Sequence, residues 1–309
     1  MKKIKFKYII VYFWSGTLVA QAELFLEREA KVEENNTRKY KVLALDLDGT
    51  LMTNDKKISP AVKEAIYEMR EKGFHVVLAS GRPTPGMYYV ADELEMKKYG
   101  GFILSFNGGC ITDYKTNKIV YSQTIPENFI NDIKEYVKET QCEVATYRGN
   151  DIITTNDKDE YIKKEAFITR MNVCKTDYFW DNITFPVNKF LLTAKPEYAR
   201  EIAYDMSEEF YGRLNVFRSE PFFVEVCPLG IDKGRSLSKL LEILGCSREE
   251  LVACGDGYND LTMIEYAGLG VSMENGCREL KEKADYICPS NENDGIAHVI
   301  SRFFLNQTD

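Results

Sequence analysis

Short apolar runs that alternate with helical stretches most strongly constrain how this chain folds. The run YKVLAL at residues 40–45 is typical of a buried strand, and Ser59 with Pro60 provides an N-cap and a first-turn proline for a helix. Gly73 ends that helix, whose apolar face is formed by Val62, Ala65, Ile66 and Met69. This segment therefore predicts a strand followed by an amphipathic helix.

The order of strand and helix repeats along the chain. FHVVLAS (residues 74–80) and GFILSFNGG (residues 101–109) are further apolar strands, and a helix begins between them at Thr84 and Pro85. Another such strand, LVACGD (residues 251–256), lies near the C-terminus. Because buried strands that alternate with helices form parallel sheets covered on both faces, we expect an α/β fold with a Rossmann-like core.

One long internal block has a different character. In residues 112–228, aromatic and hairpin-like strands alternate with amphipathic helices, which predicts a second α/β domain inserted into the first as a cap. We therefore divide the chain into a first core part at 39–111, the cap at 112–228 and a second core part at 229–309.

The N-terminal extension, residues 1–38, lies outside this pattern. Residues 1–22 have a basic start, an apolar stretch and a small-residue site, as a secretory signal has, and residues 23–38 resemble a polar linker. The alternative is a start codon assigned too early, so that the fold begins near residue 39. The apolar stretch is too short for a secure membrane span, and we expect no stable membrane association.

Composition excludes several classes of function. The net charge is -8 and no block of Lys or Arg follows residue 7, which argues against a nucleic-acid partner. The eight cysteines have neither a C-x-x-C pair nor metal-ligand spacing, and they are interpreted as small buried hydrophobic residues. The two histidines lie in apolar or helical patterns, so zinc chemistry and Ser-His or Cys-His nucleophiles lack their usual parts.

Carboxylates gather where the predicted parallel strands end. Asp46 and Asp48 follow the first strand, and Asp256 and Asp260 follow the strand near the C-terminus. Because ligands of such sheets bind at the carboxyl ends of the strands, we expect these four groups to meet. Several carboxylates around one point require a cation, and Mg²⁺ suits oxygen ligands that leave room for water and phosphate.

Each of these residues has a simpler interpretation when it is taken alone. Asp48 with Gly49 can be an ordinary turn, Asp260 can be the N-cap of the next helix, and Lys233 can be a surface lysine. Ser80 and Arg82 can belong to a solvated loop. Their joint occurrence, in order and at strand ends, favours a site.

Four motifs carry a resemblance to a known family. DLDGT (46–50), LASGR (78–82), GIDKG (230–234) and GDGYND (255–260) resemble, in this order and spacing, the haloacid dehalogenase (HAD) superfamily. The position of the insert resembles the Cof-type (HAD-IIB) phosphatases, and the likeness extends over about residues 39–305.

The resemblance implies a role for each core residue. Asp46 matches the nucleophile that forms an aspartyl-phosphate, and Asp48 matches the general acid and base. Ser80 matches the hydroxyl that binds the transferring phosphoryl group, and Lys233 matches the cation beside the nucleophile.

The resemblance also implies ligands for Mg²⁺ and for the substrate. Asp46, the backbone carbonyl of Asp48, and Asp256 match the metal ligands, with Asp260 as a second acidic partner. The glycines allow close approach of the backbone to phosphoryl oxygens. The phosphate and substrate candidates at the strand ends are Gly49, Gly81, Arg82, Asn107, Gly108 and Asn259.

The function predicted from these motifs is a Mg²⁺-dependent phosphatase, a phosphoric monoester hydrolase. Its substrate is a small phosphorylated metabolite, with a sugar phosphate as the first choice; in the cap, Tyr147, Arg148 and Arg218 are plausible contacts. The alternatives are a phosphomutase and a regulator that is phosphorylated or binds a sugar phosphate without turnover, although the intact Asp48 argues against the regulator. We expect a cytoplasmic location, with export through residues 1–22 as the alternative, and the oligomeric state stays open.

Overall fold

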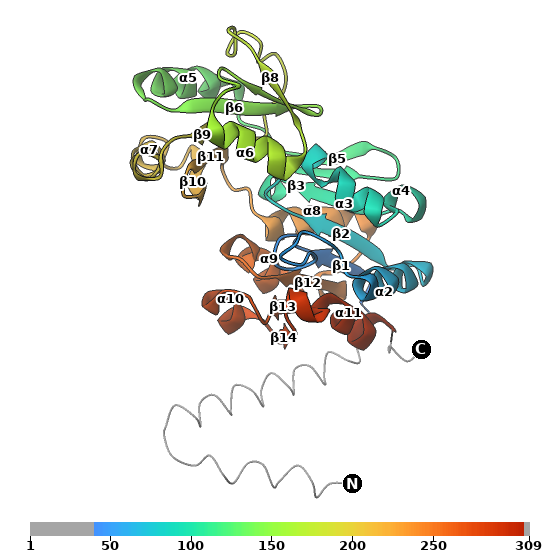
Figure 1. Ribbon diagram of the computed structural model, residues 1–309. Coiled ribbons are helices and arrows are strands. Elements are labelled where there is room, and N and C mark those ends of the chain that lie inside the picture. Colours follow the sequence, from blue (N-terminus) through green and yellow to red (C-terminus); the bar gives the residue numbers. More distant parts are fainter. Residues whose placement is uncertain (1–39, 306–309) are drawn as a thin grey trace, which may run out of the picture.

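The computed structural model describes residues 40–305, which form two stacked sheets (Figure 1). The larger sheet has eight strands in the order β14-β13-β12-β1-β2-β3-β4-β5. These strands are β1 (Val42–Leu45), β2 (His75–Ala79), β3 (Phe102–Ser105), β4 (Cys110–Asp113), β5 (Lys118–Ser122), β12 (Leu251–Gly255), β13 (Leu269–Met273) and β14 (Tyr286–Cys288).

Strand β1 occupies the centre of the larger sheet and is parallel to both of its neighbours. Val42 lies opposite Leu251 of β12 on one side and His75 of β2 on the other. The pairs β2–β3, β12–β13 and β13–β14 are also parallel, whereas the pairs β3–β4 and β4–β5 at one edge are antiparallel. The predicted α/β fold with a parallel, Rossmann-like core is confirmed.

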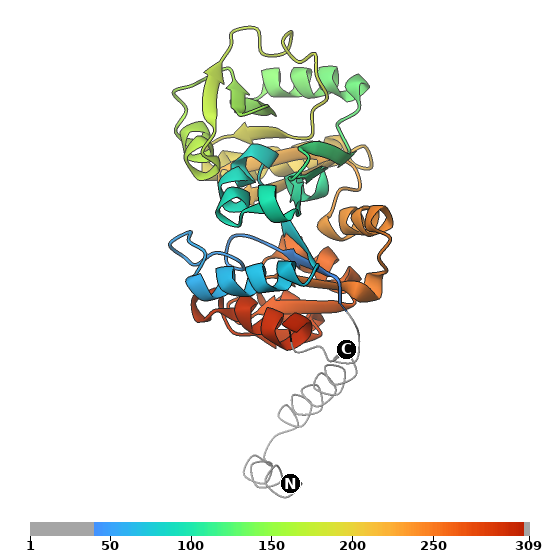
Figure 2. The ribbon, with the colours of Figure 1, turned by 90° about the vertical axis from the view of Figure 1, so that its right-hand side faces the viewer.

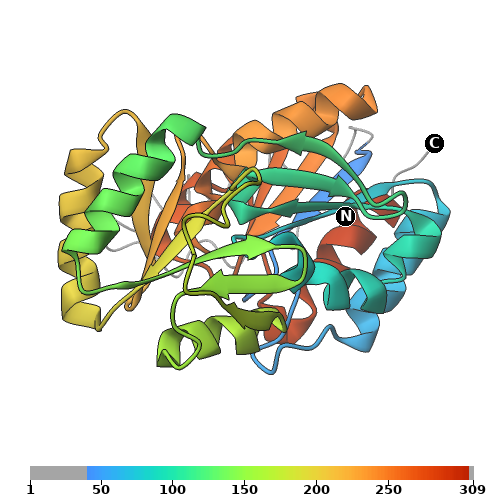
Figure 3. The ribbon, with the colours of Figure 1, turned by 90° about the horizontal axis from the view of Figure 1, so that it is seen from above.

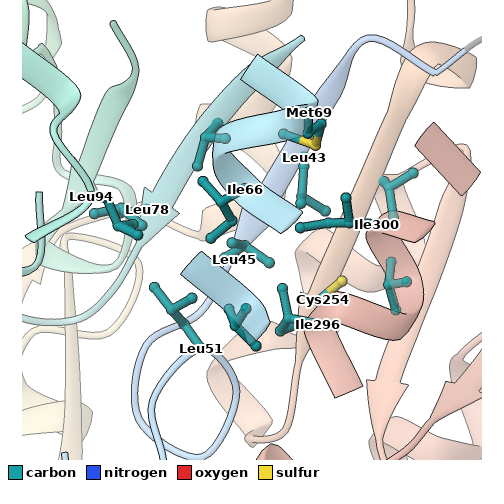
Figure 4. Packing of buried hydrophobic residues seen from close by; sticks show 14 of the residues in the cluster. Leu43, Leu45, Leu51, Ile66, Met69, Leu78, Leu94, Cys254, Ile296 and Ile300 are labelled. Atoms are coloured by element: carbon teal, nitrogen blue, oxygen red, sulfur yellow. The ribbon is translucent and has the colours of Figure 1, made fainter. Parts of the chain in front are cut away.

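Helices α2 (Pro60–Glu71), α3 (Tyr88–Glu93) and α11 (Gly295–Ile300) cover one face of this sheet. The predicted start of α2 is confirmed, because the Ser59 hydroxyl accepts a hydrogen bond from the Val62 backbone N–H at 3.2 Å. The side chains that point to this face belong to one buried cluster, which includes Leu43, Leu45, Ile66, Met69, Ile296 and Ile300 (Figure 4).

Helices α8 (Lys233–Leu244), α9 (Leu261–Tyr266) and α10 (Arg278–Lys283) cover the opposite face, and Figure 2 shows α8 and α2 on opposite sides of the sheet. Successive side chains of a strand point to opposite faces, so the residues of β1 between those of the first cluster pack here. This second cluster includes Val42, Ala44, Leu237, Leu240 and Met263.

The smaller sheet has six strands in the order β10-β11-β9-β6-β7-β8, and all pairs are antiparallel except β7–β8. Helices α5 (Ile130–Glu139) and α7 (Pro196–Glu209) pack on one face of this sheet (Figure 3), and α6 (Glu160–Thr169) packs on the other face, toward the larger sheet (Figure 1). The strands are β6 (Glu143–Arg148), β7 (Asp151–Thr154), β8 (Asn172–Lys175), β9 (Phe190–Thr193), β10 (Leu214–Glu220) and β11 (Phe223–Pro228).

The sheet pairing differs from the predicted domain division at one boundary. Residue 112 falls inside β4, whose backbone pairs with β3, and β5 then pairs with β4. The hairpin formed by β4 and β5 therefore extends the larger sheet, because the free edge of β3 offers hydrogen-bonding groups that β4 satisfies. The other boundaries of the predicted division stay predictions.

The predicted signal at residues 1–22 and the linker at 23–38 lie outside the described residues. Between residues 40 and 305, every helix is too short or too polar to traverse a lipid bilayer.

Candidate active site

Asp46 and Lys233 form a buried ion pair directly after the central strand. The Asp46 backbone N–H still donates to the Cys254 carbonyl at 3.0 Å, so the end of β1 stays fixed against β12. The Lys233 ammonium lies 2.7 Å from Asp46 Oδ1 and also donates to the carbonyl of Ala79 at 3.0 Å. Lys233 is completely buried at the first position of α8, and Asp46 is only 6% exposed. The family resemblance implied that these two residues lie together, and the structure contains this contact.

Asp260 is the second carboxylate that holds Lys233. Its Oδ1 lies 2.6 Å from the lysine ammonium, and its Oδ2 accepts the backbone N–H groups of Asp256 and Gly257 at 3.0 and 2.9 Å. Its side chain makes no capping hydrogen bond to α9. Asp260 is thus an internal partner that fixes both the lysine and the loop after β12, rather than the simple N-cap of α9.

Asp256 lies against the loop that follows Asp46. The Thr50 hydroxyl donates to Asp256 Oδ1 at 3.1 Å. Gly49 has a positive φ of 85°, and a Cβ atom at this residue would lie 2.4 Å from Asp256 Oδ2. Only glycine fits both the backbone conformation and the close approach of this carboxylate.

Of the four carboxylates that we expected to meet, those of Asp46, Asp256 and Asp260 each place an oxygen within 4.8 Å of the others, and Asp48 is not part of this group. Burial, together with the neighbouring charge of Asp260, raises the pKa of Asp46, and the same two causes raise the pKa of Asp256 to about 6. Crowded anions of this kind are relieved by a cation. The all-oxygen donor set fits Mg²⁺, because hard divalent ions prefer carboxylate ligands.

Lys233 supplies one positive charge to this group of acids. Burial alone would lower the pKa of its ammonium, but the carboxylates of Asp260 and Asp46 outweigh burial and raise it. The lysine is therefore held as a cation beside the predicted nucleophile.

Asp48 points to a different set of partners. Arg82 Nη2 donates to Asp48 Oδ2 and Oδ1 at 2.7 and 2.9 Å, and Lys56 Nζ donates to Oδ1 at 2.6 Å. Burial would raise the pKa of the Asp48 carboxyl, but the charges of Arg82 and Lys56 outweigh it and lower the pKa. Asp48 is thus an anion in this arrangement, and its side chain lies outside the three-carboxylate group.

The candidates on the strand-end loops differ in position. Asp46, Asp48, Ser80 and Arg82 line a hollow of about 260 Å³, together with Gly81, Asp256 and Asn259. Asn107 receives a hydrogen bond from Asn259 at 3.2 Å, but it lines a neighbouring hollow. Gly108 lines neither hollow, because it packs against the backbone of Asp232 and its carbonyl accepts from Ser236.

A polar cluster beside the hollow comes from the smaller sheet and from α6, and sequence reasoning named only its Tyr147. Lys189 Nζ lies 3.1 Å from Glu225 Oε1 and donates to the Gly81 carbonyl at 3.3 Å. Tyr147 donates to Glu165 at 2.7 Å, and Glu165, Lys189 and Glu225 all line the hollow. The signal in the sequence was a single charge beside or within an apolar strand, as in NKFLL and FVEVC.

The three residues of the insert that we predicted to contact the substrate lie in three different places. Tyr147 belongs to the polar cluster, through Glu165. Arg218 lines the neighbouring hollow. Arg148 is exposed and lies over the ring of Phe185 at 5.3 Å, and it lines neither hollow.

Comparison with known proteins decides the family. The model of the haloacid dehalogenase-like hydrolases matches residues 43–300. The chain belongs to this family. The predicted superfamily, its Cof-type branch and the assignment as an enzyme that hydrolyses its substrate are thereby confirmed.

Several relatives align over nearly their whole length. A haloacid dehalogenase-like hydrolase from Bacteroides thetaiotaomicron is 44% identical with a TM-score of 0.83, and covers 86% of this chain and 100% of its own. TM0651 from Thermotoga maritima is 30% identical with a TM-score of 0.79, covering 87% and 98%. The 5-amino-6-(5-phospho-D-ribitylamino)uracil phosphatase YcsE of Bacillus subtilis is 30% identical over 265 residues, covering 86% and 96%.

Proposed function

We propose that this protein is a Mg²⁺-dependent phosphatase that hydrolyses a small phosphorylated metabolite, a sugar or sugar-alcohol phosphate, through an aspartyl-phosphate on Asp46. The observation that carries the proposal is the position of Asp46. Its carboxylate is paired with the buried ammonium of Lys233 and lines the hollow that also contains Ser80 and Arg82. A fixed nucleophile surrounded by hydrogen-bond donors is what phosphoryl transfer requires.

The first chemical step forms a bond between a carboxylate oxygen of Asp46 and phosphorus, while the bond from phosphorus to the leaving oxygen breaks. Asp48 donates a proton to that leaving oxygen. Lys233 and Ser80 stabilise the charge on the phosphoryl oxygens. Mg²⁺, held by Asp46, Asp256 and the backbone carbonyl of Asp48, would neutralise further negative charge on the phosphoryl group.

The second step returns the enzyme to its starting state. Water attacks phosphorus, Asp48 takes the proton of that water, and the bond to Asp46 breaks to release inorganic phosphate. The ion pair of Asp48 with Arg82 suits this base role, because it keeps the carboxylate charged. In the first step, the incoming phosphate ester, as its monoanion, takes over the hydrogen bonds of Arg82 and supplies the proton that Asp48 passes to the leaving oxygen. The proton that Asp48 later takes from water leaves with the inorganic phosphate.

Asp260 holds other residues of the site in position. Both of its oxygens already accept hydrogen bonds, from Lys233 and from the backbone of Asp256 and Gly257. We therefore assign it the role of fixing Lys233 and orienting the ligand Asp256, which agrees with an outer position at the metal.

The substrate class is supported by the polar lining and by relatives. Glu165, Lys189 and Glu225 place hydrogen-bonding groups opposite the strand ends, where hydroxyl groups of a leaving group would lie. The relative YcsE is named for a substrate with a phosphorylated ribityl chain.

Phosphate release from a panel of sugar, sugar-alcohol and acyl phosphates tests the proposal. We expect release with Mg²⁺, loss of activity with EDTA and recovery when Mg²⁺ is returned. No release from any member would refute a phosphatase. Transfer between two positions of one sugar that requires a bisphosphate would indicate a mutase, and a long-lived phosphoaspartate without turnover would indicate a regulator.

A further inference from the structure

Two asparagines connect the loop that carries Asp48 to the loops after β13 and β14. Asn275, after β13, donates a side-chain N–H to the Gly49 carbonyl at 2.8 Å. Asn291, after β14, donates its backbone N–H to Asn275 Oδ1 at 3.1 Å and its side-chain Nδ2 to the Met52 carbonyl at 2.9 Å. We call this chain of hydrogen bonds the amide bridge. It holds two backbone carbonyls of the segment that directly follows Asp48.

The amide bridge lies in the protein interior at Asn291. Asn291 is only 7% exposed, and Met52, whose carbonyl it binds, is completely buried. The same Nδ2 atom of Asn291 lies 3.4 Å from Asn54 Oδ1, so it contacts the segment after Asp48 at two residues. Because a buried carbonyl without a donor is costly, removal of this amide would force the Met52 backbone to move toward another donor or toward water.

The segment held by the amide bridge carries two parts of the proposed chemistry. Asp48 supplies the proposed acid and base, and its backbone carbonyl is a proposed ligand for Mg²⁺. The Thr50 hydroxyl donates to Asp256 Oδ1 at 3.1 Å, so the same segment also orients a second proposed ligand. A shift of the Gly49 or Met52 carbonyl would therefore displace groups that serve proton transfer and groups that serve Mg²⁺ binding.

The loop after β13, residues 274–277, also contacts Asp256 directly. The Cys277 backbone N–H donates to the Asp256 carbonyl at 2.8 Å. A Cβ atom at Gly276 would lie 2.6 Å from Ser272 Oγ and 3.4 Å from Asp256 Cα, so this loop packs closely on the segment after β12. Residues 274–277 thus bind, by hydrogen bonds, the segment after β1 and the segment after β12, which together provide the proposed Mg²⁺ ligands.

We propose that Asn275 and Asn291 are positioning residues, which keep the carbonyl and the carboxylate of Asp48 in the geometry that Mg²⁺ binding and proton transfer require. The inference rests on the proposed phosphatase function and extends it to residues that line neither of the two hollows. Both asparagines act through the backbone of the segment after Asp48. An amide suits this role because Asn275 donates and accepts at the same time, which an ionised carboxylate cannot do.

The first test is direct Mg²⁺ binding to the full chain, measured by isothermal titration calorimetry without substrate. Asn275→Ala removes both hydrogen bonds of an exposed side chain, and Asn291→Leu keeps a side chain of similar size without a donor. Loss of such an outer hydrogen bond weakens metal binding by about 10- to 100-fold, so the Kd for Mg²⁺ should rise about tenfold or more in each variant. A wild-type Kd in Asn275→Ala, or in folded Asn291→Leu, would overturn the inference.

Asn293→Ala is the matched control. Asn293 belongs to the same short helix η7 (Asn291–Asn293), is exposed, and donates within its own loop to Ser290 Oγ at 2.9 Å. We expect Asn293→Ala to bind Mg²⁺ with the wild-type Kd, and a rise equal to that of Asn291→Leu would overturn the inference. Thermal melts verify that each variant is folded. If Asn291→Leu does not fold, the surface variant Asn275→Ala still decides the test.

The second test measures whether Asp48 has lost its position. Rapid quench at saturating Mg²⁺ gives the rates at which Asp46 is phosphorylated by the best sugar phosphate of the panel and by acetyl phosphate. The sugar phosphate needs a proton from Asp48 and acetyl phosphate does not, so Asn275→Ala and Asn291→Leu should slow the first reaction about tenfold or more and the second by less. Equal slowing of the two reactions would contradict the positioning role.

Mg²⁺ binding separates failure of this inference from failure of the proposed function. Phosphate release by the wild type, combined with an unchanged Kd for Mg²⁺ in Asn275→Ala and Asn291→Leu, would contradict only the inference. Absence of release by the wild type from every member of the panel would contradict the proposed function. The calorimetric comparison would then still show whether the two asparagines position the Mg²⁺ site.

Discussion

Arg82 and Asp48 form a two-point ion pair in which the guanidinium contacts both oxygens of the carboxylate. Nη2 lies 2.7 Å from Oδ2 and 2.9 Å from Oδ1, and Nε lies 3.1 Å from Oδ2. Arg82 Nη1 also donates to the Tyr89 hydroxyl and to the Ile168 carbonyl at the end of α6. Arg82 thus connects Asp48, the proposed general acid and base, to α6, which packs on the smaller sheet.

Replacement of Asp48 by Asn should separate the two chemical steps. A positioned acid or base contributes about 10² to 10⁴ in rate, so turnover of a sugar phosphate should fall by that order. Phosphorylation of Asp46 by acetyl phosphate needs no proton donor, and should therefore suffer less than the release of phosphate. Rapid-quench measurement of both steps checks this. Equal rates for Asp48→Asn and the wild type would remove Asp48 from the chemistry.

Replacement of Lys233 by Met should destabilise the fold as well as abolish activity. The change leaves the carboxylates of Asp46 and Asp260 buried without their cation, and breaking a buried pair costs about 3 to 5 kcal/mol. Urea unfolding measures this loss in the free energy of unfolding. Lys239→Met on the same helix is the control, because Lys239 is exposed and should cost less than about 1 kcal/mol. Similar losses for both variants would argue against the buried pair.

Replacement of Gly49 by Ala should weaken Mg²⁺ binding. The added Cβ would lie 2.4 Å from Asp256 Oδ2, so the proposed ligand must move. We expect the Mg²⁺ concentration for half-maximal activity to rise by about tenfold or more, since 1.4 kcal/mol already gives that factor. Gly73→Ala is a matched control, with a φ of 87° and open space around the added methyl group. Gly73→Ala should have the backbone strain but the same Mg²⁺ concentration for half-maximal activity as the wild type. An equal rise of this concentration in both variants would contradict the assignment of Asp256 as a Mg²⁺ ligand.

Glu165 gives a prediction about pH and stability. Burial raises the pKa of its carboxyl, so the folded protein favours the protonated form and loses stability as pH rises above the ordinary pKa of glutamate. Glu165→Gln keeps an acceptor for the Tyr147 hydroxyl and has no charge to bury. Its free energy of unfolding should exceed that of the wild type at pH 7, and the difference should shrink as pH falls toward 4.5. A less stable variant at pH 7 would contradict this.

The strand pattern of the sequence was sufficient to predict where three of the carboxylates meet. Asp46, Asp256 and Asp260 follow strands whose apolar runs are unambiguous, and parallel strands bring their carboxyl ends to one edge of a sheet. The contact between Asp46 and Lys233, which the family resemblance implied, also appears in the structure. The positions of the three carboxylates depend on local patterns that a single sequence displays.

Other features depend on how the two sheets meet, which no local pattern specifies. Lys189 contacts Gly81, and Arg82 reaches Ile168, only because α6 and β9 come to lie above the loop after β2. The boundary predicted at residue 112 falls inside the β4–β5 hairpin, which has the same alternating character as the strands of the insert. Gly108 was taken for a binding residue, although the close approach it allows is to the start of α8.

The central claim is that Asp46 is the phosphoryl acceptor, and the most direct measurement is chemical trapping of the phosphorylated enzyme. Wild-type protein mixed with acetyl phosphate and Mg²⁺, then quenched rapidly and reduced with borohydride, should yield one modified peptide, with the modification at Asp46. Asp46→Asn should remain folded, as urea unfolding can verify, and should show neither the modified peptide nor phosphate release. Retained turnover in Asp46→Asn, or a modification at another residue, would contradict the account.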